Sequence, residues 1–229
     1  MEKLSCFLAG RKVESDRELA VRNPWQGQIV ASVALADRTH VDQAVRAALD
    51  YRKPLTRFER SAILDRARDL LEAHADAFAR LITSESGLCI RESRYEVGRT
   101  RDVLRFSAME ALRDDGQIFS GDISPQGKAR KIFTLREPLS AIAAITPFNH
   151  PLNQVAHKVA PAIAAGAPII LKPSEKTPLT ALKFAELLYE AGLPGPMLSV
   201  LLGPAAEVAE PLVQDPRVEL VAFTGSVSV

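Results

Sequence analysis

The sequence predicts an α/β fold, in which a doubly wound parallel sheet follows a region of helices and β-hairpin segments. From Ser140 onward, short apolar segments alternate with segments of helical periodicity, and the links between them are short. Glycine stands where helical patterns end, at Gly166 and Gly192. We therefore divide the chain into a helical and β part over residues 1–139 and an incomplete series of βα units over residues 140–229.

The composition excludes several classes of protein. The 229 residues carry a net charge of +1 and 47% of them are hydrophobic, which is typical of a folded protein and lacks the basic excess of a nucleic-acid binder. The apolar runs are too short to span a membrane. Cys6 and Cys89 lie far apart without a CxxC pair or a histidine cluster, so we expect no metal site. Residues 1–15 lack the apolar core of a signal peptide, and we expect a cytoplasmic protein.

The part before residue 140 is predicted to contain a short β segment and a layer of helices. Thr39 is the expected N-cap of a first helix, which ends near Pro54. A second helix begins with a capping box of Thr56 and Glu59. The other expected elements are a strand over 28–33, helices over 76–84 and 91–112 separated by Gly87, an interruption over 116–127, and a strand over 131–135.

Three βα units are predicted after residue 140. Because their links are short and such crossovers are right-handed, the strands are expected to be parallel. Ligands of open α/β sheets bind at the carboxyl ends of the strands. The expected strands cover 141–145, 168–171, 198–202 and 219–223, and the helices cover 152–165, 180–191 with Gly192 as C-cap, and 205–214.

Four segments follow these strands and are candidate ligand loops. Pro, Gly and Ser also end strands for purely structural reasons, so one such segment alone would carry little weight. Their occurrence after successive strands favours a binding site. The segments are 146–151, 172–175, 203–204 and 223–226.

These segments, in this order and spacing, resemble signature blocks of the aldehyde dehydrogenase superfamily. The matching blocks are Arg136-Glu137-Pro138, residues 145–151, Lys172-Pro173-Ser174-Glu175 with Thr177-Pro178, Gly192-Leu193-Pro194, and Phe223-Thr224-Gly225-Ser226. The resemblance covers the whole chain but only about the first half of a family member. Residues 148–158 and 95–99 are further similar to the phosphonoacetaldehyde dehydrogenase branch.

The resemblance implies a Rossmann-like NAD site in residues 140–229. The cofactor fold of this family is unusual, and the absence of a G-x-G-x-x-G loop here is consistent with it. Lys172 and Glu175 are implied to face the adenine ribose, where a carboxylate favours NAD over NADP because it repels a 2′-phosphate. The implied cofactor contacts are Ile145, Thr146, Pro147, Phe148, Lys172, Ser174, Glu175, Gly203, Pro204, Phe223, Gly225 and Ser226.

Asn149 is the implied catalytic residue. Its side-chain amide would donate to the oxyanion that forms when a thiolate attacks an aldehyde. The structural alternative is an asparagine that caps the following helix. The resemblance favours the oxyanion role.

Arg99 and His150 are the implied substrate-binding residues. Most relatives have an aromatic or apolar residue where this chain has His150, which agrees with the phosphonate branch. The two basic side chains would bind the phosphonate of the substrate. The alternative is a surface arginine and a histidine at a helix start, and His157 is expected to be structural.

The resemblance places the cysteine nucleophile and the glutamate base in the half that follows residue 229. We therefore expect Cys6 and Cys89 to be packing residues, the last strand to leave apolar surface uncovered, and this chain alone to be inactive. The full-length relative would be a homo-oligomer that oxidises a small aldehyde, phosphonoacetaldehyde, to its acid. A non-catalytic nucleotide-binding or structural module of the same fold is the alternative. A related acyl-phosphate or acyl-CoA reductase fits residues 172–175 less well.

Overall fold

The main sheet has six strands in the order β11-β8-β9-β10-β2-β3. The computed structural model describes residues 2–113 and 116–225. Four neighbouring strands are parallel, as predicted: β8 (Ile142–Ile145), β9 (Ile169–Lys172), β10 (Leu198–Val200) and β11 (Leu220–Phe223). Two antiparallel strands, β2 (Phe7–Leu8) and β3 (Arg11–Lys12), extend the β10 edge. The N-terminal segment therefore belongs to the same sheet as the later units.

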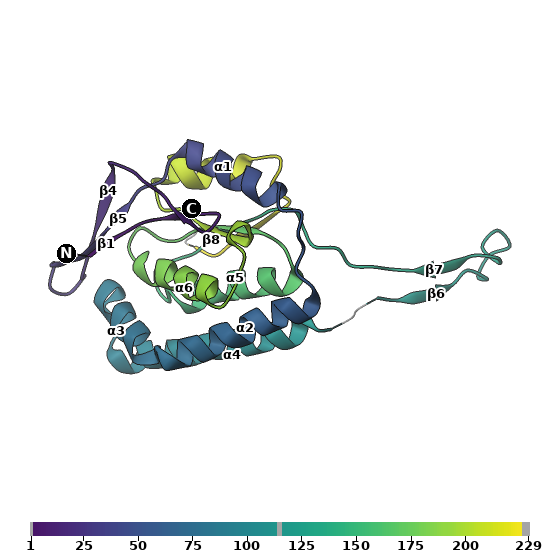
Figure 1. The fold of residues 1–229 in the computed structure, drawn as a ribbon, viewed down its shortest axis with the longest axis horizontal. Helices are drawn as coiled ribbons and strands as arrows, with labels where there is room; N and C mark the ends of the chain where they lie inside the picture. The colour runs from purple at the N-terminus through teal and green to yellow at the C-terminus, as the bar shows by residue number, and fades with distance from the viewer. Residues whose placement is uncertain (1, 114–115, 226–229) are drawn as a thin grey trace.

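Helices cover both faces of this sheet, which confirms the doubly wound architecture (Figure 1). One face carries α5 (Asn153–Ala165) and α6 (Leu179–Glu190). The other carries α1 (Arg38–Leu49), the π-helical turn η2 (Ala205–Ala209) and α7 (Glu210–Gln214). An outer layer packs on α5 and α6 and consists of α2 (Arg57–Ala73), α3 (Ala75–Ser86) and α4 (Ile90–Ala111).

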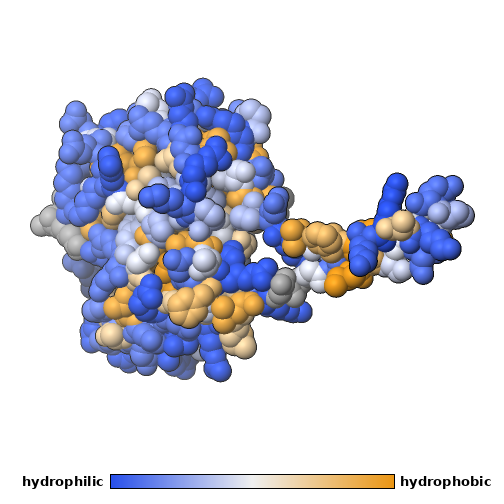
Figure 2. All heavy atoms as spheres, turned by 45° about the vertical axis from the view of Figure 1, so that its right-hand side comes forward, coloured by the Kyte–Doolittle hydropathy of each residue, from blue (hydrophilic) through white to orange (hydrophobic). Residues whose placement is uncertain are grey.

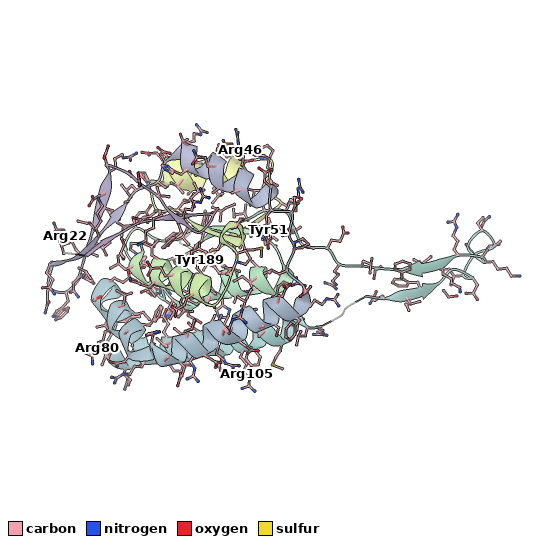
Figure 3. All side chains as sticks on the ribbon, viewed as in Figure 1. Arg22, Arg46, Tyr51, Arg80, Arg105 and Tyr189 are labelled. Carbon is pink, nitrogen blue, oxygen red and sulfur yellow. The ribbon has the colours of Figure 1, made fainter. Side chains whose placement is uncertain are left out.

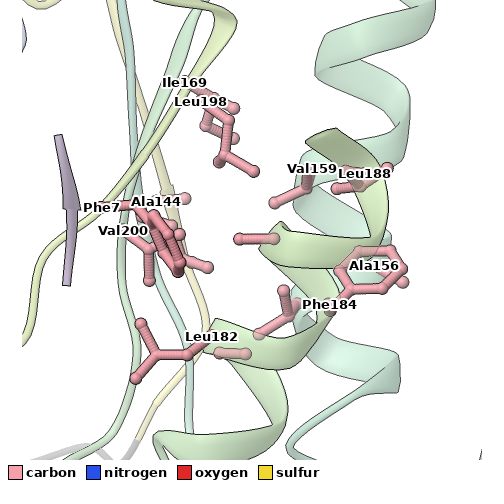
Figure 4. Close-up of a cluster of buried hydrophobic side chains, with 14 of the residues drawn as sticks. Phe7, Ala144, Ala156, Val159, Ile169, Leu182, Phe184, Leu188, Leu198 and Val200 are labelled. Carbon is pink, nitrogen blue, oxygen red and sulfur yellow. The ribbon is translucent and has the colours of Figure 1, made fainter. Parts of the chain in front are cut away.

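The core lies between the parallel strands and α5 and α6 (Figure 4). Ile169, Leu198 and Val200 of the sheet are each at most 1% exposed and face the buried Leu182 of α6, whereas the equally buried Phe184 points from α6 away from the sheet. Burial on this scale is the main favourable contribution to folding. Among the long polar side chains, some hydrogen-bond inside the core and others point into solvent. Tyr189 of α6 donates its hydroxyl to Leu198 O at 2.8 Å, whereas Arg80 and Arg105 extend outward from the outer helices (Figure 3).

A capping box starts α2, as the sequence predicts. The Glu59 N–H donates to Thr56 Oγ1 at 3.2 Å, and the Thr56 N–H donates to Glu59 Oε2 at 2.7 Å. For α1 the predicted N-cap Thr39 is wrong. The cap is Asp37, whose Oδ1 accepts from the N–H groups of Thr39 and His40 at 2.9 and 3.2 Å. Its carboxylate stands two residues earlier and reaches both free N–H groups of the first turn.

We expect Thr56→Ala to lower the free energy of unfolding by about 1 kcal/mol, because the N–H of Glu59 loses its acceptor. Urea denaturation would measure the change. Thr39→Ala is the matched control, since Thr39 is exposed inside α1 and caps nothing. Equal losses in the two variants would contradict the capping role.

Two smaller sheets lie outside the main one. Strands β1 (Glu2–Leu4), β5 (Ile29–Ala34) and β4 (Glu18–Arg22) form one of them. The other is a hairpin of β6 (Ile118–Ser120) and β7 (Lys131–Phe133), which we call the arm, and it extends away from the body (Figure 1). The predicted interruption over 116–127 therefore contains an unpredicted strand, β6.

The arm and the last strand expose apolar side chains. On and beside the arm, Ile118 and Ile123 are 89% and 90% exposed, and Figure 2 shows apolar colouring on the part of the arm nearer the body, with a largely hydrophilic tip. On β11, Leu220, Val221 and Phe223 are each more than 40% exposed. Uncovered apolar surface was expected at this last strand, and the structure confirms it.

Candidate functional site

The carboxyl ends of the four parallel strands lie side by side at one edge of the sheet. Ile145 pairs with both Lys172 and Phe223, and Val200 pairs with Leu171. The chain crosses the sheet in the order β8, β9, β10 and then returns to place β11 on the other side of β8. The strand order therefore reverses between β8 and β11. In open α/β sheets such a switch point forms the crevice that binds ligands.

Lys172 and Glu175 form an ion pair at the end of β9. Lys172 is 5% exposed, and its Nζ donates to Glu175 Oε1 at 2.5 Å. The Glu175 side chain itself is 41% exposed. Ser174 shapes the turn, because its Oγ accepts from the Lys176 N–H at 3.2 Å. The pair holds a solvent-facing carboxylate in one orientation, which suits an acceptor of hydroxyl hydrogens.

The loop after β8 is tied to the loop after β9. The Thr146 N–H donates to Lys172 O at 3.3 Å, and Thr177 Oγ1 donates to Phe148 O at 3.4 Å. Lys176 Nζ lies 4.4 Å from the centroid of the half-exposed Phe148 ring. Pro147 lies between these anchors, so residues 145–148 are held at the carboxyl ends of β8 and β9.

Asn149 follows this segment and is exposed. Within the described residues its side chain makes no hydrogen bond, and it does not cap α5. The N–H groups of Leu152 and Asn153 at the start of α5 instead donate to Glu96 Oε1, at 2.8 and 2.9 Å. The capping alternative for Asn149 is therefore wrong, and its amide is open to a ligand.

The end of β10 contributes Gly203 and Pro204. Gly203 is buried, and a Cβ there would lie 2.6 Å from Ala36 O and 2.6 Å from Val208 Cγ2. Glycine is needed at this position because the chain packs closely against Ala36. Pro204 is exposed and immediately precedes η2.

The end of β11 lies directly beside the loop after β8. The Thr224 N–H donates to Ile145 O at 3.2 Å, and Lys158 of α5 donates its Nζ to Thr224 Oγ1 at 2.8 Å. Phe223 and Gly225 are exposed at this edge. Ser226, the last predicted cofactor contact, lies outside the described residues.

Basic side chains stand in the turn before α5, on α5 itself and on α4. The Nδ1 of His150 is 3.4 Å from Glu96 Oε2, and the His150 side chain is 48% exposed. Arg99 is exposed on α4. Burial, and then the charges of Arg99 and Lys158, lower the pKa of His157, so these three groups are close enough to interact. His157 is exposed, which differs from the structural role expected for it.

Sequence reasoning gave His157 only a structural role and did not single out Glu96 as part of this edge. His157 lies on α5, whereas His150 precedes that helix, so helical spacing gives no signal that links the two. Glu96 has only a weak signal, a carboxylate among the buried positions of α4.

The two cysteines differ from each other. Cys6 is fully buried, its Sγ donates to Ala34 O at 3.1 Å, and burial raises the pKa of its thiol to about 11, so it is a packing residue as expected. Cys89 is exposed at the N-cap of α4, so the packing role predicted for it is wrong. Among residues 2–113 and 116–225, no three His, Cys, Asp or Glu side chains gather as metal ligands. None of the described helices is long and apolar enough to cross a membrane.

Comparison with known proteins identifies the family. Residues 11–229 match the model of the aldehyde dehydrogenase family. The chain belongs to this family. Aldehyde dehydrogenases of known structure superpose on nearly the whole chain. The chain is 35% identical to aldehyde dehydrogenase 21 from Physcomitrella patens, solved with the reaction product succinate, with a TM-score of 0.93 over 98% of this chain and 48% of that one.

Two further aldehyde dehydrogenases bear on the cofactor and the substrate. Betaine aldehyde dehydrogenase of Staphylococcus aureus, solved with NAD⁺, is 29% identical with a TM-score of 0.92, over 98% of this chain and 46% of that one. The 3-sulfolactaldehyde dehydrogenase of Priestia aryabhattai is 40% identical over 99% of this chain and 48% of its own length. This chain thus spans about half the length of the curated relatives it matches. That relative is named for a sulfonate, so the narrower phosphonoacetaldehyde resemblance is not shown by it.

Proposed function

We propose that this chain provides the NAD site and the oxyanion donor of an enzyme that oxidises an anionic aldehyde to its carboxylic acid. One arrangement carries the proposal. The Lys172–Glu175 pair follows β9, the exposed amide of Asn149 follows the neighbouring β8 and makes no hydrogen bond among the described residues, and basic side chains stand on α4 and α5. Cofactor, reacting carbonyl and anionic group would then lie in that order along the crevice.

We infer that NAD binds at the strand ends. The anchored Glu175 carboxylate has the chemistry to accept from the 2′ and 3′ hydroxyls of the adenine ribose, and it would repel the 2′-phosphate of NADP. Residues 145–148 would border the ribose and nicotinamide, with Phe223 beside them, and Gly203 and Pro204 would border the adenine. Gly225 and Ser226 would offer backbone N–H groups to phosphate. When bound, NAD supplies the hydride acceptor.

Asn149 would act on the aldehyde itself. Its amide is exposed and unengaged, so it can donate to the carbonyl oxygen as negative charge develops there. The fixed loop around it limits the reorganisation needed during the reaction, because Phe148 O and the N–H groups of Leu152 and Asn153 are already bonded.

The substrate would carry an anionic group beyond its aldehyde. One relative is named for 3-sulfolactaldehyde and another was solved with succinate, and sulfonate and carboxylate are both anions. Arg99, His150 and His157 supply basic groups on the side where such a group would lie. Within this class we propose phosphonoacetaldehyde, oxidised to phosphonoacetate, with 3-sulfolactaldehyde as the competing substrate.

Assembly and location form part of the same proposal. The exposed apolar side chains of the arm, such as Ile118 and Ile123, support a homo-oligomer in which another copy covers them. We place the enzyme in the cytoplasm, in keeping with a free buried thiol at Cys6 and no disulfide among the described residues.

The cofactor assignment is tested by titrating the purified chain with NAD and with NADP in a calorimeter. We expect NAD to bind more tightly than NADP, and Glu175→Ala to weaken NAD binding by about 10- to 100-fold because hydrogen bonds to a charged acceptor are lost.

Glu186→Ala is the matched control for this titration. Lys183 and Glu186 form an ion pair with the same three-residue spacing on α6, at 3.0 Å, away from the strand ends. This variant should bind NAD as the wild type does. An unchanged NAD affinity in Glu175→Ala, or tighter binding of NADP, would contradict the assignment.

A further inference from the structure

The two helices that start at the site edge have no cap of their own. The N-cap residues are Leu152 for α5 and Pro178 for α6, and neither supplies a side-chain hydrogen bond. A buried glutamate from the outer helix layer takes this role in each case: Glu96 of α4 for α5, and Glu85 of α3 for α6. Free N–H groups at a helix start need such acceptors when water is excluded.

The two glutamates use their oxygens differently. Glu85 uses both, since Oε2 accepts from the Leu179 N–H at 2.7 Å and Oε1 from the Thr180 N–H at 2.9 Å. Glu96 binds both N–H groups of α5 through Oε1 alone. Its buried Oε2 has no hydrogen-bond partner among the described residues, and the nearest basic atom is the Nδ1 of His150, at an ion-pair distance of 3.4 Å. Glu96 thus has a second oxygen facing the turn that carries Asn149 and His150.

We propose that Glu96 is a positioning residue of the site: one carboxylate oxygen fixes the start of α5, and the other holds the His150 imidazole, so that both anchor the Asn149–His150 turn. Among the described residues, the side chains of Asn149 and His150 make no hydrogen bond of their own, and the turn is fixed through the backbone on either side. The His150 carbonyl accepts from the Gln154 N–H at 3.0 Å, which links the turn to the same helix start. The inference rests on the proposed function only in treating Asn149 and His150 as ligands of the aldehyde.

The electrostatic balance at Glu96 agrees with this geometry. Burial raises the pKa of the Glu96 carboxyl, while the N–H groups of Asn153 and Leu152 and the nearby His150 oppose that rise. The charged groups that face it are His150 from the turn and Glu85 from α3. Because His150 is the only basic group among them, its presence should favour the carboxylate form of Glu96.

Nuclear magnetic resonance of the chain tests the anchoring. In Glu96→Ala, amide hydrogen exchange at Leu152 and Asn153 should rise by about 10- to 100-fold, because both N–H groups lose a charged acceptor. The backbone order parameters of Asn149 and His150 should fall with it. Glu96→Gln keeps an acceptor oxygen and should restore most of the protection at Leu152 and Asn153.

Glu85→Ala is the matched control, because it uncaps α6 in the same manner. It should raise exchange at Leu179 and Thr180 and leave the order of Asn149 and His150 unchanged. If the turn loosens equally in the Glu85 and Glu96 variants, or in neither, the positioning role is wrong.

A second measurement does not depend on whether Glu96→Ala folds. The Glu96 carboxyl can be titrated through its ¹³C signal in the wild type and in His150→Gln. Since His150 lowers the pKa of Glu96, the pKa should be higher in the variant, and identical titrations would overturn the contact. Neither measurement uses NAD or an aldehyde. Failure of the positioning role is therefore distinguishable from failure of the proposed function.

Discussion

Glu85→Gln is expected to remove about 3 kcal/mol of pH dependence from the free energy of unfolding. Burial raises the pKa of the Glu85 carboxyl from 4.5 to about 7, against the opposing hydrogen bonds from Thr180 and Leu179. Between these two pH values the folded chain holds a proton that the unfolded chain has released. The stabilising contribution is therefore complete below about pH 4.5 and is lost as the pH rises through about 7.

The measurement is urea denaturation of both proteins at pH 5 and pH 8. The wild type should lose stability relative to Glu85→Gln across this interval, because glutamine keeps an acceptor for the helix start but cannot ionise. Glu190→Gln, an exposed change at the far end of α6, should follow the wild type. Parallel pH profiles for the wild type and Glu85→Gln would show that Glu85 does not titrate in this interval.

Asn149→Ala is expected to lower kcat by about 10²- to 10³-fold in an enzyme that includes the cysteine nucleophile. The variant removes the amide that donates to the developing oxyanion, and it removes little else. Asn149 is exposed and makes no hydrogen bond among the described residues, and Glu96 continues to cap α5. The variant should therefore keep both its Tm and its NAD affinity.

Steady-state kinetics with an anionic aldehyde would measure this effect. Thermal unfolding and NAD titration of the same variant serve as its controls. A kcat within a few-fold of wild type would show that Asn149 does not stabilise the oxyanion. A lowered Tm would show that Asn149 has a structural role.

The parts of the fold that depend on local pattern could be predicted from the sequence. The capping box at Thr56 and the alternation of strands and helices after residue 140 are set by neighbouring residues, and the structure reproduces them. Elements that depend on contacts between residues far apart in the sequence could not be predicted in this way. Phe7 pairs with Val200 through a strand of two residues, and β6 lies in a segment rich in Gly, Asp and Ser. The N-cap of α1 was misplaced because Asp37 and Thr39 are both good caps two residues apart.

The candidate site likewise has parts that the sequence predicts and parts that it does not. The sequence placed its loops correctly, because parallel strands bring their carboxyl ends to one edge. It could not show that Glu96, which is distant in the sequence, caps α5 and so leaves the Asn149 side chain without a capping role. A cap supplied from another helix appears in the sequence only as one more polar residue in a helical segment.

The two supplied caps also explain a missing motif. Glycine-rich phosphate loops work because backbone N–H groups at a helix start are left free for the ligand's oxygens. At α5 and α6 those N–H groups already bind Glu96 and Glu85, so a dinucleotide gains nothing by bringing its phosphates there. Because no phosphate has to approach the backbone of these two turns closely, neither turn needs glycine. A search that recognises nucleotide sites by glycine spacing would therefore not detect a site at these two helix starts.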